Sequence, residues 1–538
     1  MDRIAFIGEG QSDVHLLVAD AGLKGVNLAR LDRLGLRVPP ALVLNTALSE
    51  EFHSRGSLPP GFAVQLAGAL KELEDATGLT LGGSRPLLLS VRSSPVVAMP
   101  GMLDTLLNVG LTEGGVHRLI RRTGNPWLAW DCYRRLARAF GEAGNHFPFG
   151  EFERLTTDHL TRGGARELQE LDPISMRNLA CDSAALLSGA SPRTLPDDPV
   201  GQVVRAVELV LASWNAPRAQ EYRRICGLDE RAGMAVIIQA MVLGNGGARS
   251  GSGVGFTRNP ANGDDELYVD FIFNAQGDDV VSGREAVHDG DVLPAVLPNI
   301  WHELERIRPL LEREFADMQD FEFTVEDGEL FLLQTHHGKR TPWAAARIAV
   351  DLVRSGIVDP PTALRQLAPY DLKALVHRSV SRDTSREPIA RAIAAGPGVA
   401  TGGVVFGVQH ARQRAASGPV ILVRNGIGAA DLPGIAAADG VLTASGGRTS
   451  HATVVARQLG KACLVGCAAL HVDETKQSCM LGSRVLHEGD VITIDGNSGL
   501  VFAGRVDVVV DRPHEALAII ESWRRQMSGP ATDGCSPS

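Results

Sequence analysis

The first 230 residues alternate between helical and strand-like patterns and then become mostly helical. The segment Lys24 to Gly35 places four apolar side chains near one helical face, which predicts a helix: Val26, Leu28, Leu31 and Leu34. The following residues, LRVPPALVLNT, read as a break into a strand. A second strand is predicted from Leu87 to Val91, directly before Arg92. Residues 116–230 carry helical patterns such as WLAWDCYRRLARAF and predict a helical insertion.

Strand patterns return between Met234 and Thr341. The segments MAVIIQAMV and ELYVDFIF predict strands, and FEFTVEDGELFLLQT predicts a hairpin whose turn contains Asp327 and Gly328. Residues 342–385 begin with a helical pattern and end in a charged, irregular stretch that is typical of a linker between domains. Residues 386–510 predict a compact domain of short strands and turns. Residues 511–538 form a predicted tail, whose end, RRQMSGPATDGCSPS, is expected to be disordered.

The composition is that of a globular protein with two to four domains. The chain has 538 residues, of which 44% are hydrophobic and 22% are charged. Lys and Arg number 53 against 63 Asp and Glu, and this net charge of −10 argues against nucleic acid as the main partner. We expect a cytoplasmic protein without a signal peptide or a membrane partner, because no apolar stretch has the necessary length and position. The seven cysteines are scattered, and Cys463 and Cys467 have no second pair at zinc spacing, so we expect free thiols.

The sequence GGRTSHATVVARQLG, residues 446–460, predicts a helix that begins at a histidine. Thr449 and Ser450 are favourable helix caps, and the apolar periodicity starts at His451. The imidazole would then lie beside unpaired backbone N–H groups and the positive end of the helix dipole, both of which stabilise an anion. A neutral imidazole is a nucleophile near neutral pH, and phosphorylation on nitrogen would turn it into such an anion. The alternative interpretation is a histidine that only packs or hydrogen-bonds at the start of a helix.

Two basic residues in the first part of the chain are candidates for binding phosphate. Lys24 lies between Gly22 and Gly25 at the start of a predicted helix, a position that suits a phosphate contact, although many helices begin in this way. Arg92 follows a predicted strand and precedes a Pro-Gly turn. Its guanidinium could hold phosphate oxygens in a bidentate arrangement, or it could form a structural ion pair.

The segment GNGGARSGSGVG, residues 244–255, is rich in glycine. Its backbone N–H groups could cover phosphates as a mobile lid, or the segment could be a flexible hairpin connection. The glycines assigned to this predicted lid are Gly244, Gly246, Gly247, Gly251 and Gly253.

Two carboxylates on one predicted strand are candidate ligands for Mg²⁺. Asp320 and Glu322 alternate along DFEFTV and therefore point to one face of the strand. Carboxylate pairs suit Mg²⁺ that is bridged to phosphate oxygens, and Gln334 on the returning strand could join them. The alternative interpretation is a solvent-exposed strand face that carries charges.

These segments, in this order, resemble the pyruvate phosphate dikinase family of phosphoenolpyruvate-utilising enzymes. The string from Gly446 through His451 to Arg457 is similar to the family's phosphohistidine signature, and GLKGVNLARLDRLGLRVPP, VRSSPVVAMPGMLDTLLNVGL and FEFTVEDGELFLLQT continue the similarity. The resemblance implies a multidomain α/β (α+β) fold. Its implied parts are an ATP-grasp nucleotide-binding domain (1–341, with the helical insertion at 116–230), a helical linker (342–385), a phosphohistidine swivelling domain of α/β type (386–510) and the tail (511–538).

The resemblance also implies the roles of individual residues. His451 would be the phosphorylated residue, and ATP and Mg²⁺ would be required, with Asp320 and Glu322 binding the metal. The residues expected to contact ATP are Lys24, Arg92, Gln334 and His336. The residues expected to surround the phosphohistidine are Gly447, Arg448, Thr449 and Ser450.

Three features depart from the family pattern. His336 stands where the family usually has arginine. Ser94, Pro95 and Val96 follow Arg92, where the family tends to have small residues and often a second basic one. The family's C-terminal barrel, which binds pyruvate and phosphoenolpyruvate, needs about 250 residues. Residues 511–538 cannot supply it, so we expect the acceptor site on a separate protein or domain.

The sequence therefore predicts an ATP-dependent phosphotransferase that carries a phosphoryl group on His451 to an acceptor site on a partner. The expected small-molecule partners are ATP or AMP and phosphate or pyrophosphate, while the final acceptor and the oligomeric state, for which a homodimer is one option, stay open. One alternative is a dikinase-like transferase that phosphorylates another acceptor, such as water or an antibiotic. A second alternative is a regulatory protein that binds nucleotide without turnover.

Overall fold

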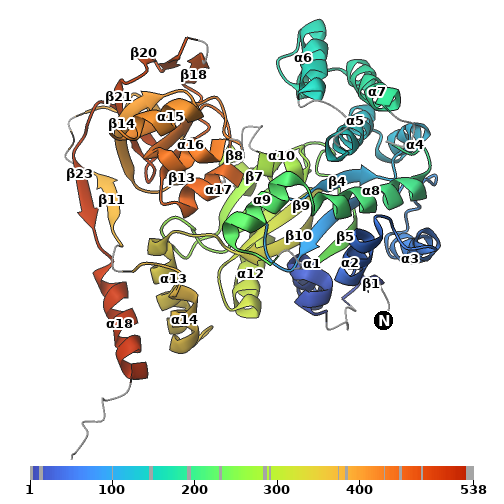
Figure 1. Ribbon diagram of the computed structural model, residues 1–538, viewed down its shortest axis with the longest axis horizontal. Helices are drawn as coiled ribbons and strands as arrows, with labels where there is room; N and C mark the ends of the chain where they lie inside the picture. The colour runs from blue at the N-terminus through green and yellow to red at the C-terminus, as the bar shows by residue number, and fades with distance from the viewer. Residues whose placement is uncertain are drawn as a thin grey trace, which may run out of the picture. The chain divides into compact units, whose positions relative to one another are not determined.

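The computed structural model describes most of the chain in two compact units. It describes residues 4–10, 16–99, 101–144, 150–190, 195–229, 233–282, 288–289, 292–372, 375–381, 384, 386–428, 431–447, 451–473 and 476–528. The first unit combines Met1–Ser250 with Thr324–Thr335, and the second combines Gly251–Phe323 with His336–Ser538. Figure 1 follows the elements of both units along the chain, from blue at the N-terminus to red. The boundaries at residues 341 and 386 that the sequence suggests stay predictions.

A five-stranded antiparallel sheet forms the centre of the first unit (Figure 1). Its strand order is β1 (Ile4–Ile7), β2 (Ala41–Leu44), β5 (Met234–Ala240), β3 (Leu89–Pro95) and β4 (Thr105–Val109). The helices before β3 are α1 (Val18–Arg33), α2 (Thr46–Arg55) and α3 (Phe62–Thr77). Every residue of β2 and β5 is buried, because these strands lie inside the sheet and are covered on both faces. The predicted strand MAVIIQAMV, which contains β5, therefore forms part of the core of this sheet.

The predicted helical insertion is confirmed. It contains α4 (Glu113–Thr123), α5 (Pro126–Ala143), α6 (Glu151–Gly163), α7 (Pro173–Ala190), α8 (Pro199–Ser213) and α9 (Pro217–Cys226), with a short 3₁₀ turn at Leu168–Glu170. The local sequence determines where several of these helices begin. Thr112, Asn125 and Asp198 each accept a backbone N–H bond as a helix cap. Helix α5 packs on β4 and also contacts α7, which contacts α6 in turn (Figure 1).

A second five-stranded sheet contains the predicted hairpin. Its order is β10 (Glu329–His337), β9 (Gln319–Glu326), β6 (Gly251–Phe256), β7 (Tyr268–Phe273) and β8 (His288–Asp289). Asp327 and Gly328 form the turn between β9 and β10, with φ values of 49° and 84°. Asp-Gly is the residue pair that a two-residue turn with positive φ favours, so the predicted hairpin is confirmed.

The end of the chain differs from the expected disordered tail. The second unit contains α10 (Gly277–Ser282), α11 (Val292–Val296), α12 (Pro298–Phe315), α13 (Pro342–Arg354), α14 (Pro360–Leu367) and α18 (His514–Ser528). Helix α18 packs on α13 and α14 through Ala516, Ile520 and Trp523, which are buried in one shared core. Their spacing of four and three residues forms an apolar stripe along one helical face. The prediction of a disordered end was thus wrong up to Ser528; residues 529–538 lie outside the described ones.

The predicted C-terminal domain is built on an eight-stranded sheet. Its order is β12 (Ala390–Arg391), β22 (Leu500–Ala503), β21 (Val491–Asp495), β14 (Val399–Val405), β15 (Val420–Arg424), β16 (Gly440–Thr443), β17 (Ala462–Val465) and β13 (Ile393–Gly396). The four strands from β14 to β17 are parallel. The helices are α15 (Val408–Arg414), α16 (Leu432–Ala437) and α17 (His451–Gln458). Strands joined by helices in this way confirm the predicted α/β class.

Two small sheets accompany this domain. A three-stranded sheet contains β18 (Leu470–Asp473), β19 (Ser478–Leu481) and β20 (Arg484–His487). The stretch predicted as an irregular linker forms β11 (His377–Val380), which pairs antiparallel with β23 (Val508–Asp511).

Two further expectations concern thiols and membranes. Cys463 and Cys467 are buried free thiols, as expected. Among the described helices, none combines the length and the apolar character that a membrane span requires.

Candidate active site

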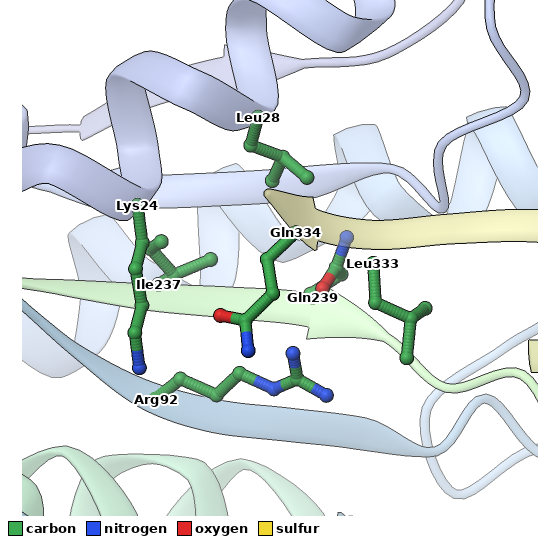
Figure 2. A pocket seen from close by; sticks show the side chains of 7 residues that line it. All are labelled: Lys24, Leu28, Arg92, Ile237, Gln239, Leu333 and Gln334. Carbon is green, nitrogen blue, oxygen red and sulfur yellow. The ribbon is translucent and has the colours of Figure 1, made fainter. Parts of the chain in front are cut away.

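Lys24, Arg92 and Gln334 line one small pocket in the first unit (Figure 2). In this view the Lys24 ammonium and the Arg92 guanidinium lie on either side of the Gln334 amide, and Leu28 and Leu333 also line the pocket. Lys24 was predicted on a helix, and Arg92 and Gln334 were predicted on or next to two strands. The three residues are more than 60 positions apart in sequence. Two cations that face one recess form a local positive field even in an acidic protein, which favours an anionic ligand.

Gly22 and Ser94 set the position of Lys24. Gly22 has a φ of 65°, which kinks α1 immediately before Lys24, and a Cβ at position 22 would overlap the Ser94 carbonyl oxygen. The Ser94 hydroxyl donates to the Ala21 carbonyl at 2.8 Å and accepts from the Gly25 N–H at 3.1 Å. Strand β3, which carries Arg92, thereby holds the start of the helix that carries Lys24.

Residues 93–95 are part of β3, which continues beyond the predicted strand end at Val91. Ser94 is fully buried and its hydroxyl is used for the contacts with α1. This structural role of Ser94 explains why a small hydroxyl residue stands at this position. A second phosphate contact from Ser94 has no support in this geometry.

Asn27 connects α1 to β10 on the other side of the pocket. Its side-chain amide donates to the Thr335 carbonyl at 2.8 Å, next to Gln334. Gln334 is 8% exposed, and its side-chain carbonyl oxygen has no hydrogen-bond partner among the described residues. A buried acceptor without a donor costs free energy unless a ligand or a water molecule supplies one. The sequence did not predict these roles of Asn27 and Ser94, because each depends on a contact with a residue far away in the chain.

Asp320 and Glu322 share one face of β9, as the alternation predicted. Both are partly exposed, whereas Phe321 and Phe323 between and after them are buried on the opposite face. Burial raises the pKa of Asp320 to about 8, and the negative charge of Glu322 acts in the same direction, against the positive charge of Lys339. Two neighbouring carboxylates repel each other when both are ionised, and a cation bound by both of them removes this repulsion.

Protein groups alone do not complete a metal site here. In the parts of the chain that the structure describes, no group of three or more His, Cys, Asp or Glu residues is arranged to hold a metal ion. Mg²⁺ commonly uses one or two carboxylates and completes its shell with water and substrate phosphates. The donor set of Asp320 and Glu322 therefore fits Mg²⁺ bound together with a nucleotide.

The predicted lid is shorter than the glycine pattern suggested. Gly244 is buried and Gly246 is exposed in the connection between β5 and β6, and Gly247 has a φ of 129°. Gly251 and Gly253 instead lie within β6 and are buried. A side chain at Gly251 would overlap the ring of Phe271, and one at Gly253 would overlap Phe323. These two glycines make room for aromatic packing within the sheet, and the lid role of the segment stays a prediction. We use the term glycine loop for residues 244–250.

The backbone at His451 has the predicted form. Helix α17 begins at His451 and follows β16, whose parallel neighbour β17 comes after the helix. His451 therefore lies at the carboxyl end of a strand in a parallel sheet, where ligands of α/β proteins commonly bind. Gly446 (φ 111°) and Gly447 are buried in the turn before the helix. Arg448, Thr449 and Ser450 lie outside the described residues, as does the side chain of His451.

Arg457 holds α17 in place. Its guanidinium Nε donates to the Ala395 carbonyl on β13 at 2.9 Å, and the side chain is 2% exposed. The signature arginine thus fixes the helix that begins at His451.

Comparisons with known proteins match both parts of the chain. The model of the pyruvate phosphate dikinase AMP/ATP-binding domain matches residues 51–291, which include Arg92 and the glycine loop. The model of the mobile domain of phosphoenolpyruvate-utilising enzymes matches residues 416–499, which include His451. The chain therefore has the nucleotide-binding and mobile domains of this class of phosphotransferases.

The chain is also similar to curated relatives. The chain is 40% identical to pyruvate, phosphate dikinase of Rhizobium meliloti (strain 1021), covering 93% of this chain and 58% of the relative. It is 37% identical to the chloroplastic pyruvate, phosphate dikinase 1 of Arabidopsis thaliana, covering 97% and 55%. It is 36% identical to the enzyme of Rickettsia felis, covering 98% and 61%. The predicted resemblance to pyruvate phosphate dikinase is confirmed, and the chain spans little more than half the length of these relatives.

His336 gives a first testable prediction. It lies two residues after Gln334 and therefore on the same face of β10. If it faces the ATP phosphates, His336→Arg should raise the rate at which ATP phosphorylates the chain, because an arginine keeps its positive charge at every working pH. His337→Arg serves as the control, since the exposed His337 side chain points to the opposite face of β10. An unchanged rate in His336→Arg would place His336 outside the phosphate site.

Proposed function

We propose that this chain is an ATP-dependent phosphotransferase of the dikinase type, in which ATP and Mg²⁺ phosphorylate His451. The observation that carries the proposal is the pocket formed by Lys24, Arg92 and Gln334. It combines two cations with a buried acceptor that lacks a donor, and the matched AMP/ATP-binding domain supports a nucleotide as its ligand.

The pocket residues divide the recognition of ATP between them. Lys24 and Arg92 would bind phosphate oxygens, Lys24 as a point charge and Arg92 through its planar fork of donors. The side-chain oxygen of Gln334 would accept a hydrogen bond from a donor on the nucleotide. His336 would add positive charge at the phosphates only when it is protonated.

Asp320 and Glu322 would hold Mg²⁺ at the phosphates. The metal would neutralise part of the phosphate charge and orient the transferred group. The role of the two side chains is to fix the metal through oxygen ligands on one face of β9, while the phenylalanines on the other face keep the strand in its sheet.

His451 would act as the nucleophile. A ring nitrogen would form the N–P bond while the phosphoanhydride P–O bond breaks, and the bond electrons would leave with the AMP or ADP oxygen. The first backbone N–H groups of α17 would then face the new negative charge. Gly447, Arg448, Thr449 and Ser450 would surround the phosphohistidine.

We further propose that the acceptor is held outside these 538 residues, by a partner protein or another domain. Phosphoryl transfer requires an acceptor held in line and shielded from water, in a site distinct from the pocket that would bind ATP. The mobile domain would carry the phosphohistidine to that site. Pyruvate and phosphate are the co-substrates that the named relatives suggest.

The test is an assay of the purified chain in both directions. Phosphoenolpyruvate, AMP and pyrophosphate are supplied to look for ATP, and ATP, phosphate and pyruvate are supplied to look for phosphoenolpyruvate. We expect phosphorylation of the chain by ATP without sustained turnover, and turnover after addition of a partner fraction. Sustained turnover by the chain alone would contradict the external acceptor, and a chain that binds ATP without phosphorylation would contradict the transferase proposal.

A further inference from the structure

A buried carboxylate on α5 lies at the centre of a cluster of charged groups. Asp131 is fully buried and accepts hydrogen bonds from Arg134 at 2.6 and 3.0 Å and from Arg135 at 2.7 Å. Burial by itself would raise the pKa of Asp131, but the charges of Arg135 and Arg134 outweigh it and hold this pKa at about 2. Asp131 is therefore a fixed negative charge at every physiological pH.

Asn245 of the glycine loop contacts the same carboxylate. Its side-chain amide nitrogen lies 3.4 Å from Asp131 Oδ2, and the residue is 1% exposed. The next residue, Gly246, is exposed, so the chain emerges from the protein interior directly after this contact. The contact joins the helical insertion to the loop that connects β5 and β6.

The two ends of the loop are attached to the hairpin tip of the same unit. Before Asn245, the Leu243 N–H donates to Glu326 Oε2 at 3.1 Å. After it, Ser250 Oγ accepts from the Asp327 N–H at 3.0 Å, and the Gly328 N–H donates to the Arg249 carbonyl at 2.8 Å. Together with the Asn245 contact there are four contacts in and next to the glycine loop, and Gly246 to Ala248 is the continuous stretch of the loop without one of them.

We infer that Asn245 is a positioning residue for nucleotide binding and that Asp131 acts through it. The inference deepens the proposed function and rests on the prediction from the sequence that the glycine loop covers the ATP phosphates. A flexible glycine segment loses conformational entropy when a ligand orders it, and this loss weakens binding. The Asn245–Asp131 contact fixes the point where the Gly246–Ala248 segment begins, so the exposed N–H groups of this segment are available to ATP phosphates at a lower entropic cost. The helical insertion thus contributes to ATP affinity without touching the nucleotide.

The test compares variants that keep the loop sequence otherwise intact. Asn245→Asp preserves shape but places a second carboxylate group against Asp131, and Asn245→Ala removes the amide. The control is Asn125→Ala at the start of α5, where the Asn125 side chain caps the helix by accepting from the Leu128 N–H at 3.0 Å. This control loses helix stability without a change in the loop contact.

Two quantities are measured on the full chain: hydrogen exchange of the amides at 246–250 without nucleotide, and the Kd for ATP with Mg²⁺. We expect faster exchange and a Kd raised about tenfold in Asn245→Ala, and a larger rise in Asn245→Asp. The control should leave both quantities within about twofold of the unmodified chain.

The outcomes separate the inference from the proposed function. If hydrogen exchange of the amides at 246–250 is unchanged in both Asn245 variants, the positioning role of Asn245 is overturned. Faster hydrogen exchange with an unchanged Kd for ATP would overturn it as well. If the unmodified chain binds ATP but is not phosphorylated, the transferase proposal fails while the Kd comparison still decides this inference. If the unmodified chain does not bind ATP, both are overturned.

Discussion

Replacement of Asp320 by asparagine is expected to reduce Mg²⁺-dependent phosphorylation of the chain by about a hundred- to a thousandfold. The amide keeps the size of the side chain but removes the charge that a hard cation requires. Glu322→Gln should cause a loss of similar order, because the two side chains share one face of β9. Glu329→Gln is the matched control, since Glu329 lies on the neighbouring strand in an exposed ion pair with Arg37. Full activity of Asp320→Asn at low Mg²⁺ would contradict the metal assignment.

The raised pKa of Asp320 leads to a prediction of how the affinity for Mg²⁺ depends on pH. Burial and the charge of Glu322 raise the pKa of Asp320 to about 8 in the metal-free protein. Below that pH the carboxyl is mostly protonated, so Mg²⁺ must displace a proton. The affinity for Mg²⁺ should therefore increase as pH rises from 6.5 to about 8 and then level off. Calorimetric titration of the nucleotide-bound chain with MgCl₂ measures this trend, which Asp320→Asn should abolish.

The second large effect is expected from Gly22→Ala. A methyl group at position 22 would overlap the Ser94 carbonyl oxygen, and the φ of 65° would add backbone strain. We expect the free energy of unfolding to fall by at least about 3 kcal/mol. Because Lys24 follows the kink directly, ATP affinity should fall even in the fraction that stays folded.

Gly35→Ala provides a control with matched backbone geometry. Gly35 has a φ of 69° and open space where the methyl group would be placed. The free energy of unfolding of this variant should fall only by the cost of the backbone strain, about 1 kcal/mol, and its ATP affinity should be unchanged. Thermal and chemical unfolding of both variants measures the difference. Equal stability of the two variants would show that the approach of α1 to Ser94 does not restrict position 22.

Local patterns predicted those parts of the candidate site whose geometry is local. The alternation around Asp320 sets its face of β9, and Asp327-Gly328 sets the hairpin turn, since both depend on residues next to one another. The start of α17 at His451 followed from the change from glycines and caps to apolar periodicity. The roles of these residues stay predictions.

Long-range contacts explain most of what the sequence did not predict. Gly251 and Gly253 look like loop residues until Phe271 and Phe323 are placed on them. Ser94 was not predicted to contact α1, because its partner Ala21 lies 73 positions away in sequence. Helix α18 had a readable apolar stripe that ends at Trp523, but its polar end suggested disorder. The contact between Asn245 and Asp131 likewise joins residues far apart in the chain.

The central claim is that ATP phosphorylates His451. Its most direct measurement is incubation of the chain with Mg²⁺ and ATP labelled in the β or the γ phosphate, followed by peptide mapping. We predict an acid-labile, base-stable label on the peptide that contains His451, and the labelled position will show whether a phosphoryl or a pyrophosphoryl group is transferred first. A folded His451→Ala variant should carry no label. Label that persists in this variant would contradict the assignment of His451 as the phosphorylated residue.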